Sequence, residues 1–227
     1  MPKKKSSEKE DLKHLIAKQS GIQLDIGCGA SKTPGFIGID FLDLPGVDIV
    51  HDLQKTPWPL EDESVVRAIA SHVVEHIDPT PPDSRLISLI KLLQDKKLIS
   101  AREVKEHLGE LSLTPRFIAF MNEIWRIMKP DGEFIIATPY AGSLGYWQDP
   151  SHCNPCNEFT WEYFDPIAPI TKGAFYQFYR PKPWKIKTSM HSKNGNMELI
   201  LVKRRDDPSY HGGKPGPLGG MGMVGVN

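Results

Sequence analysis

The sequence contains few cysteines, no long apolar run and no excess of charge of either sign. Its three cysteines, Cys28, Cys153 and Cys156, are too few for a disulfide framework and favour a reducing, cytoplasmic setting. No stretch approaches the roughly 20 apolar residues that span a bilayer, and the charged N-terminus lacks the apolar core of a secretory signal, so we expect no membrane contact. Because 28 basic residues balance 28 acidic ones, the overall charge gives no attraction to nucleic acid.

The composition is that of one globular domain. Of the 227 residues, 39% are hydrophobic and 25% are charged, so the chain can bury a sizeable core. We expect a tail and a short helix over residues 1–20 and the main domain over residues 21–205. Within it, residues 79–115 are expected to form a helical insertion, either a cap over the substrate side or a peripheral helical pair. The Gly- and Pro-rich residues 206–227 cannot bury much apolar surface, and we expect them to be disordered.

Short apolar runs that stop at Gly, Asp, Ser or Pro predict buried strands. The runs are residues 22–26, 36–39, 47–50, 65–70, 133–137, 174–180, 184–189 and 197–203. Asn194-Gly195 predicts a hairpin turn between the last two.

Apolar residues at helical spacing predict helices over residues 84–95, 101–110 and 115–128, and Lys129–Gly132 predicts the turn that ends the third. Strands that alternate with helices, followed by an antiparallel hairpin, predict a doubly wound α/β sheet with a mixed edge. In such sheets ligands bind at the carboxyl ends of the strands.

Polar residues with recognisable roles stand at those ends. In LDIGCG, Gly27 and Gly29 follow a buried strand, where they allow a tight turn and a close approach of a ligand to the main chain. Asp40 ends the second run and can accept hydrogen bonds from a ribose diol. Asp52 ends the third run, followed by Leu53, and can accept from the amine of an adenine ring. Each feature alone also fits an ordinary turn or a solvated acid, but together they predict a nucleotide-like ligand.

In this order the motifs resemble those of class I S-adenosylmethionine-dependent methyltransferases. LDIGCG resembles their first glycine motif, GFIGID the strand that ends in the ribose-binding acid, and FMNEIWRIMKPDGEFIIATP the helix, turn and fifth strand, over roughly residues 21–140. The resemblance implies a Rossmann-like, mostly parallel seven-stranded sheet with an antiparallel C-terminal hairpin, and S-adenosylmethionine as the cofactor. One departure is that few residues separate Gly29 from the second strand, so the first crossover helix is shortened.

The resemblance also implies a role for each matching residue. Those expected around the methionine part of the cofactor are Asp25, Gly27, Cys28 and Gly29. Asp40 is expected to bind the ribose, and Asp52 with Leu53 to face the adenine. Ser71 and His72, at the end of the fourth run, are expected beside the methyl group.

Three residues are candidates for catalysis. His72, followed by Glu75 and His76, is a candidate general base or acceptor-binding group. Asp149 and His152 form a second cluster after the fifth run, where similar methyltransferases often carry a DPxH-like loop. His152, Cys153 and Cys156 raise the question of zinc, but three ligands on one short loop lack a second pair, so we expect no metal site.

The sequence therefore predicts in-line methyl transfer to an acceptor that it does not identify: a small molecule, a sugar, a protein or RNA. DNA amine methylation is disfavoured, because Ser71–Val74 stands where an Asn/Asp-Pro-Pro-Tyr/Phe-like tetrapeptide is usual. A nicotinamide-dependent dehydrogenase would need a third glycine where Lys32 stands. A catalytically inactive module of the same fold that binds S-adenosylmethionine or a nucleotide is the remaining alternative.

Overall fold

The computed structural model describes residues 21–79, 84–100, 102–103 and 114–211. The predictions for residues 1–20 and for most of the helix over 101–110 lie outside these residues. The tail predicted to be disordered is described only to His211, and its first part forms a short 3-10 helix, η2 (Pro208–His211). Gln177 Nε2 donates to Tyr210 O at 2.8 Å, so this turn is joined to the domain.

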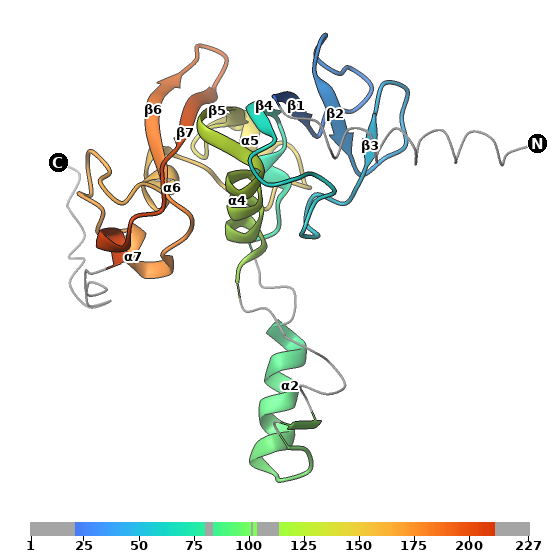
Figure 1. Cartoon of the computed structure of the whole chain (residues 1–227), viewed down its shortest axis with the longest axis vertical. Helices are drawn as coiled ribbons and strands as arrows, with labels where there is room; N and C mark the ends of the chain where they lie inside the picture. Colours follow the sequence, from blue (N-terminus) through green and yellow to red (C-terminus); the bar gives the residue numbers. More distant parts are fainter. Residues whose placement is uncertain (1–20, 80–83, 101, 104–113, 212–227) are drawn as a thin grey trace, which may run out of the picture.

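Seven strands form one mixed sheet in the order β3-β2-β1-β4-β5-β7-β6. The strands are β1 (Ile22–Ile26), β2 (Ile37–Asp40), β3 (Ile49–Val50), β4 (Val65–Ser71), β5 (Met128–Pro139), β6 (Trp184–His191) and β7 (Asn196–Lys203). The first five run parallel to one another, and β7 lies antiparallel to both β5 and β6. The predicted fold class, a mostly parallel seven-stranded sheet with an antiparallel C-terminal hairpin, is confirmed (Figure 1).

The helices outside the insertion are few and mostly short. They are η1 (Val74–His76), α4 (Arg116–Ile127), α5 (Leu144–Trp147), α6 (Glu158–Glu162) and α7 (Tyr176–Tyr179). In the insertion, α2 (Ser84–Asp95) forms where helical spacing predicts it and projects away from the sheet (Figure 1). No helix in the described part of the chain is long and apolar enough to cross a membrane.

The strand predicted over residues 174–180 is wrong, because this segment contains α7. The segment is rich in aromatic residues, which favour strands. In the structure Tyr163 stacks on Phe175 with ring centroids 4.7 Å apart, and Tyr176 is fully buried. Arg180 then ends the helix in the left-handed region at φ 46. Packing of aromatic rings on one side of a short helix therefore overrides the local pattern.

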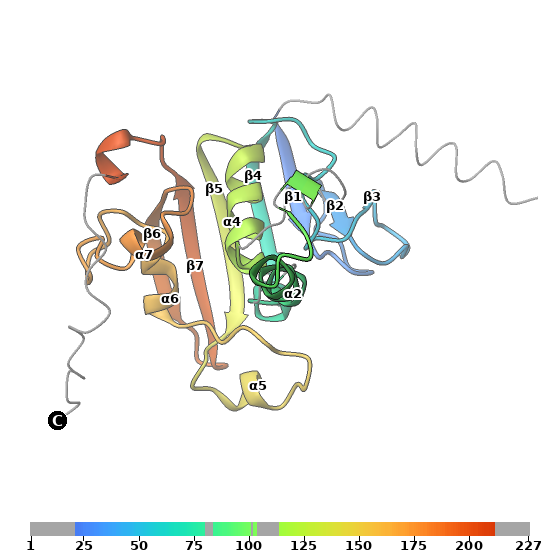
Figure 2. The ribbon, with the colours of Figure 1, turned by 90° about the horizontal axis from the view of Figure 1, so that it is seen from below.

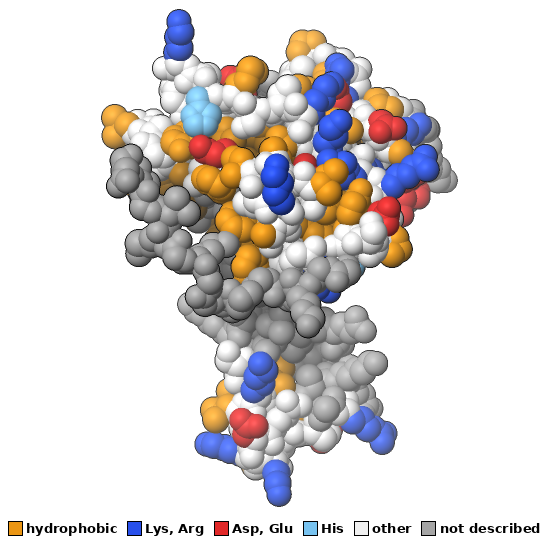
Figure 3. All heavy atoms as spheres, turned by 90° about the vertical axis from the view of Figure 1, so that its left-hand side faces the viewer, with side chains coloured by type: hydrophobic (Ala, Val, Ile, Leu, Met, Phe, Trp, Pro, Cys, Tyr) orange, Lys and Arg blue, Asp and Glu red, His pale blue; other side chains and the backbone are white. Residues whose placement is uncertain are grey.

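The core lies on one face of the sheet. Leu24, Ala68, Phe134 and Leu201 occupy neighbouring register positions on this face, and all are fully buried. Figure 2 shows α4 lying across this part of the sheet. The opposite face carries partly exposed apolar side chains among charged ones, and its members include Arg67, Ile69, Glu133, Ile135, Ile200, Val202, Lys185 and Lys187. Basic, acidic and apolar side chains all occur on the β6 and α7 side of the molecule (Figure 3).

Candidate functional site

A cavity of about 610 Å³ lies at the carboxyl ends of β1, β2 and β4. Its lining residues are Gly27, Asp40, Phe41, Asp52, Leu53, Gln54, His72, Val73, His76, Ile77 and Ser151. Five of the residues that the sequence singled out for cofactor binding are therefore together at one cavity. This is the edge of the sheet where parallel α/β folds bind ligands.

The glycine loop forms one wall of the cavity and requires its glycines. Gly27 and Gly29 both have positive φ, 66 and 54, which side chains disfavour. A β-carbon on Gly27 would also lie 2.5 Å from Val73 Cγ2, inside van der Waals contact. The loop therefore gives a ligand direct access to main-chain atoms.

Asp40 joins the end of β2 to the glycine loop. Its Oδ2 accepts from Gly29 N at 2.9 Å, and its Oδ1 accepts from Leu42 N at 2.9 Å. The side chain lines the cavity although only 6% of the residue is exposed. Because an ionised carboxylate has about four acceptor positions, each oxygen keeps capacity for a ligand hydroxyl.

The connection from β1 to β2 consists of turns, in keeping with the shortened first crossover, and acids hold it in place. Asp25 Oδ2 accepts from Thr33 N at 2.7 Å, so this buried carboxylate lies under the loop and does not line the cavity. Asp48 accepts from Gly38 N at 2.8 Å and pairs with Lys32 Nζ at 2.6 Å. These bonds do the positioning that a full crossover helix would otherwise provide.

Cys28 and Ser71 also do not line the cavity. The Cys28 sulfur packs beneath β2, where a β-carbon on Gly38 would lie 2.5 Å from it. Burial and the nearby carboxylate of Asp25 raise the pKa of this thiol to about 11, so it stays protonated near neutral pH. Ser71 is exposed at the end of β4.

The part of the cavity that follows β2 and β3 combines apolar side chains with a carboxylate, a combination suited to a flat ring. Leu53 is buried, Ile77 is buried beside it in the same core cluster, and Phe41 is 65% exposed. Asp52 is half-exposed, and its carboxylate lies 3.3 Å from Lys55 Nζ. Apolar surface beside a carboxylate acceptor matches a purine with an exocyclic amine.

His72 stands at the end of β4 in a strained backbone conformation. Its φ is 57, in the left-handed region that non-glycine residues rarely adopt, and its N donates to Ala137 O at 2.8 Å. The imidazole is half-exposed to the cavity. Nδ1 lies 3.2 Å from Glu75 Oε1, and Nε2 lies 3.3 Å from Asn196 Nδ2. The ring is therefore held on both sides.

Glu75 lies behind His72 and is completely buried. Its Oε2 accepts from Thr138 Oγ1 at 3.1 Å, whereas the described partner of its Oε1 is the imidazole of His72. Its backbone carbonyl accepts from Cys153 N at 2.9 Å and Asn154 N at 3.0 Å, which ties η1 to the loop after β5.

That loop brings the second predicted cluster to the same end of the cavity. Ser151 Oγ donates to Asp149 Oδ1 at 2.6 Å and lies 3.2 Å from His76 Nδ1. His152 lies edge-on to His76, with ring centroids 4.7 Å apart, and its Nδ1 lies 2.7 Å from Tyr146 O. Asp149 and His152 thus lie beside the cavity without lining it. The hydrogen bonds from Ser151 lower the pKa of Asp149.

The cysteines of this loop form no zinc set with His152 among the described residues. Cys156 is fully buried, and its Sγ lies 3.5 Å from Asn154 O. Burial raises the pKa of the Cys156 thiol, and burial also raises the pKa of Cys153. Both behave as protonated thiols.

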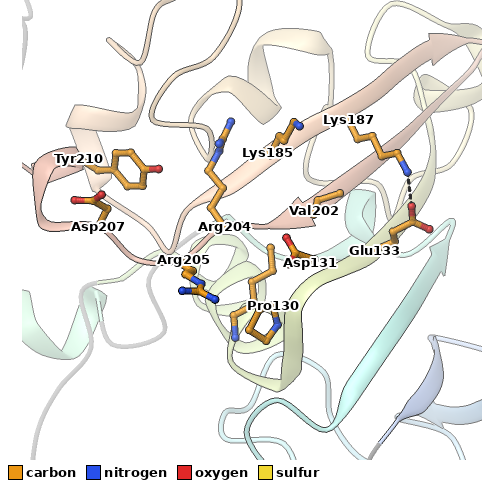
Figure 4. A pocket seen from close by; sticks show the side chains of 11 residues that line it. Pro130, Asp131, Glu133, Lys185, Lys187, Val202, Arg204, Arg205, Asp207 and Tyr210 are labelled. Carbon is orange, nitrogen blue, oxygen red and sulfur yellow. Dashed lines mark hydrogen bonds and ion pairs between the residues drawn. The ribbon is translucent and has the colours of Figure 1, made fainter.

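A second cavity, of about 570 Å³, lies over β5, β6 and β7 (Figure 4). Its charges are partly neutralised within the protein, since Lys187 Nζ lies 2.5 Å from Glu133 Oε1 and Arg204 pairs with Asp165. None of the residues that the sequence singled out for cofactor binding or catalysis lines it. The cavity at the glycine loop is therefore the better candidate site.

Comparison with known proteins yields only distant structural similarity. No protein-family model matches this sequence, and no curated protein matches it either. The structure is similar to a SAM-dependent methyltransferase from Archaeoglobus fulgidus, with 16% identity, a TM-score of 0.46 and coverage of 87% of this chain and 94% of that one. It is also similar to a SAM-dependent methyltransferase from Aquifex aeolicus, with 13% identity, a TM-score of 0.43 and coverage of 86% and 89%. At this level of similarity, function has to be argued from the geometry of this chain.

Proposed function

We propose that this chain is an S-adenosylmethionine-dependent methyltransferase acting on an acceptor that is a small molecule, a sugar, a protein or RNA. The observation that carries the proposal is the contact of Asp40 with the glycine loop at a cavity whose wall also includes His72. The cavity is large enough for a nucleoside. Its walls include a carboxylate that can accept from ribose hydroxyls (Asp40), a glycine turn with accessible main-chain atoms (Gly27) and an imidazole (His72).

In this proposal each wall of the cavity binds one part of the cofactor. The free acceptor positions of Asp40 take the ribose hydroxyls, and Gly27 lets the amino-acid part approach the main chain. Leu53, Phe41 and Ile77 pack on the adenine, with Asp52 near its amine. The sulfonium methyl then points toward His72 and His76.

The transfer itself is an in-line displacement. A lone pair of the acceptor attacks the methyl carbon, the carbon–sulfur bond breaks, and its electron pair stays on sulfur, which leaves S-adenosylhomocysteine. The protein contributes mainly by alignment, because holding the reactants in position can supply a large part of the rate. When the acceptor carries a proton, His72 takes it.

The surroundings of His72 fit a general base. Asn196 Nδ2 is a donor, so a hydrogen bond from it places the lone pair of the imidazole on Nε2 and the proton on Nδ1, which faces the carboxylate of Glu75. Nε2 can take the proton of the acceptor once the Asn196 amide turns away and frees that lone pair.

Isothermal titration with S-adenosylhomocysteine tests the cofactor assignment. Asp40→Ala is expected to weaken binding by about 1–3 kcal/mol, from loss of charge-assisted hydrogen bonds. Asp43→Ala, at an exposed acid of the same loop, is the matched control and is expected to bind normally. Unchanged affinity in Asp40→Ala, or tighter binding of NAD than of S-adenosylhomocysteine, would contradict the proposal.

A radiolabelled methyl-transfer screen across the four acceptor classes tests turnover. With an acceptor in hand, His72→Asn is expected to lower kcat by about 100-fold at unchanged cofactor affinity. Cofactor binding without transfer to any acceptor would favour the inactive binding module.

A further inference from the structure

Three potential metal ligands meet at the acceptor end of the cavity. Glu75, His76 and His152 each offer one ligand atom, and these atoms lie within 4.8 Å of one another. Glu75 and His76 come from η1, and His152 comes from the loop after β5. Ligand atoms bound at about 2.1 Å around one ion lie roughly 3.5 Å apart, so a small inward movement of the side chains would complete a site.

The buried carboxylate of Glu75 is only weakly compensated at one oxygen. Glu75 is 0% exposed, and the described group paired with its Oε1 is Nδ1 of the half-exposed His72, at 3.2 Å. A buried carboxylate is costly unless each oxygen is compensated by a donor or a cation. A metal ion bound at this carboxylate would add to that compensation.

Both histidines are oriented as metal ligands usually are. Only Nδ1–H of His152 can bond to the carbonyl oxygen of Tyr146, 2.7 Å away, so the lone pair is on Nε2. The hydroxyl of Ser151 donates to Asp149, so it accepts from Nδ1–H of His76, which again leaves the lone pair on Nε2. Histidines that bind metals generally donate their other N–H to a protein oxygen in this way.

We propose that Glu75, His76 and His152 bind one divalent first-row transition-metal ion such as Zn²⁺. Two imidazoles and one carboxylate suit such an ion better than Mg²⁺, and three protein ligands leave a coordination position open. The site was not predicted from sequence, because its ligands lie on segments far apart in the chain.

The open position identifies the acceptor class, an inference that rests on the proposed function. His76 and Ser151 line the cofactor cavity, so a group bound to the ion would face the methyl donor. A hydroxyl oxygen there would be oriented and made more acidic by the ion. It would attack the methyl carbon while the sulfur keeps the electron pair of the broken bond, and its proton would pass to His72. The acceptor is therefore a hydroxyl compound.

Metal binding is tested on the full chain after removal of metals by chelator and dialysis. Titration with Co²⁺, followed by visible absorption, and equilibrium dialysis with Zn²⁺ are expected to give one ion per chain. Glu75→Gln and His76→Gln are expected to weaken binding at least tenfold. His211→Gln is the matched control, because His211 also lies beside a carboxylate, at 3.1 Å from Asp206, but outside the cluster.

Thermal unfolding with and without Zn²⁺ guards against variants that fail to fold. The ion is expected to raise the Tm of the wild type and of His211→Gln but not that of His76→Gln, whose side chain is only partly buried. No binding to the wild type, or equal binding to all variants, would overturn the metal site. Titration of the metal-free protein with S-adenosylhomocysteine keeps the two proposals apart, since it tests the cofactor site alone.

Discussion

Two buried glutamates of this chain have opposite surroundings. Glu123 in α4 is matched on both oxygens: Trp58 N donates to Oε1 at 2.6 Å, and Arg126 donates to Oε1 and Oε2 at 2.5 and 3.1 Å. Glu75 has a neutral donor, Thr138, on Oε2, and its Oε1 is paired with Nδ1 of the half-exposed His72 at 3.2 Å. Both residues are almost inaccessible, at 6% and 0% exposure. Burial alone therefore does not distinguish them, but their partners do.

The difference separates a structural carboxylate from a functional one. The charge of Glu123 is neutralised by an arginine of its own helix and ties α4 to the segment before β4, so its role is complete within the protein. The charge of Glu75 is instead paired with the half-exposed imidazole of His72, which lines the cavity. Four substitutions test this comparison.

The largest effect is expected for Glu123→Ala. It leaves the guanidinium of Arg126 without its main partner and the buried Trp58 N without an acceptor, so we expect a loss of about 3 kcal/mol in the free energy of unfolding. Urea unfolding measures it. Asp62→Ala, which removes the exposed partner of Arg126, is the control and is expected to cost less than about 1 kcal/mol. Equal losses would mean that burial of Glu123 does not matter.

A smaller loss is expected for Thr138→Val, which keeps the shape of a fully buried side chain and removes the donor to Glu75 Oε2. We expect the free energy of unfolding to fall by about 1–2 kcal/mol, because Oε2 of the buried Glu75 loses its hydrogen bond from Thr138. Thr188→Val is the matched control, since the buried Thr188 hydroxyl has no partner, and it is expected to be neutral or slightly stabilising. The comparison fails if Thr188→Val costs as much.

Glu75→Gln is expected to change the free energy of unfolding by less than about 1 kcal/mol. The amide keeps the acceptor for Thr138 and removes a buried charge that is incompletely compensated, so two opposing contributions nearly cancel. Chemical unfolding of metal-free protein measures it. If the free energy of unfolding fell by more than about 2 kcal/mol, Glu75 would be a structural residue like Glu123.

The smallest effect is expected for Glu133→Gln on the partly exposed face of the sheet. Glu133 pairs with Lys187 and Arg67, and exposed pairs contribute at most about 0.5 kcal/mol at low salt. The hydrogen bond from Lys187 lowers the pKa of Glu133. Its contribution is therefore present above the ordinary glutamate pKa of about 4.3 and is lost as the pH falls through the lower pKa of the folded state. Urea unfolding at pH 7 and pH 3, compared with wild type, checks the sign.

Much of the fold, and the grouping of several residues at the candidate site, could be predicted from the sequence. Strand ends marked by Gly27, Asp40 and Asp52 converge at one cavity because parallel strands end at one edge of the sheet. The helix predicted over residues 115–128 matches α4 within a residue at each end, because its apolar spacing reflects one buried face.

What sequence did not provide depends on side chains that meet across long separations. Nothing local in the sequence indicates that His152 lies beside His76, since a loop after β5 brings them together. Asp25 and Cys28 belong to the glycine motif, yet their side chains turn under the loop, and a motif does not state which way each residue points. The sequence likewise could not show that residues 174–180 contain a short helix, α7, that packs in an aromatic cluster.

The left-handed backbone at His72 predicts which substitutions this position tolerates in the folded protein. Glycine and asparagine adopt that conformation readily, whereas β-branched residues do not. In a saturation library, glycine and asparagine at this position would yield more folded protein than valine or isoleucine. If His72 is the proposed base, all four would lower the methylation rate, so abundance and catalytic fitness would rank the same variants differently.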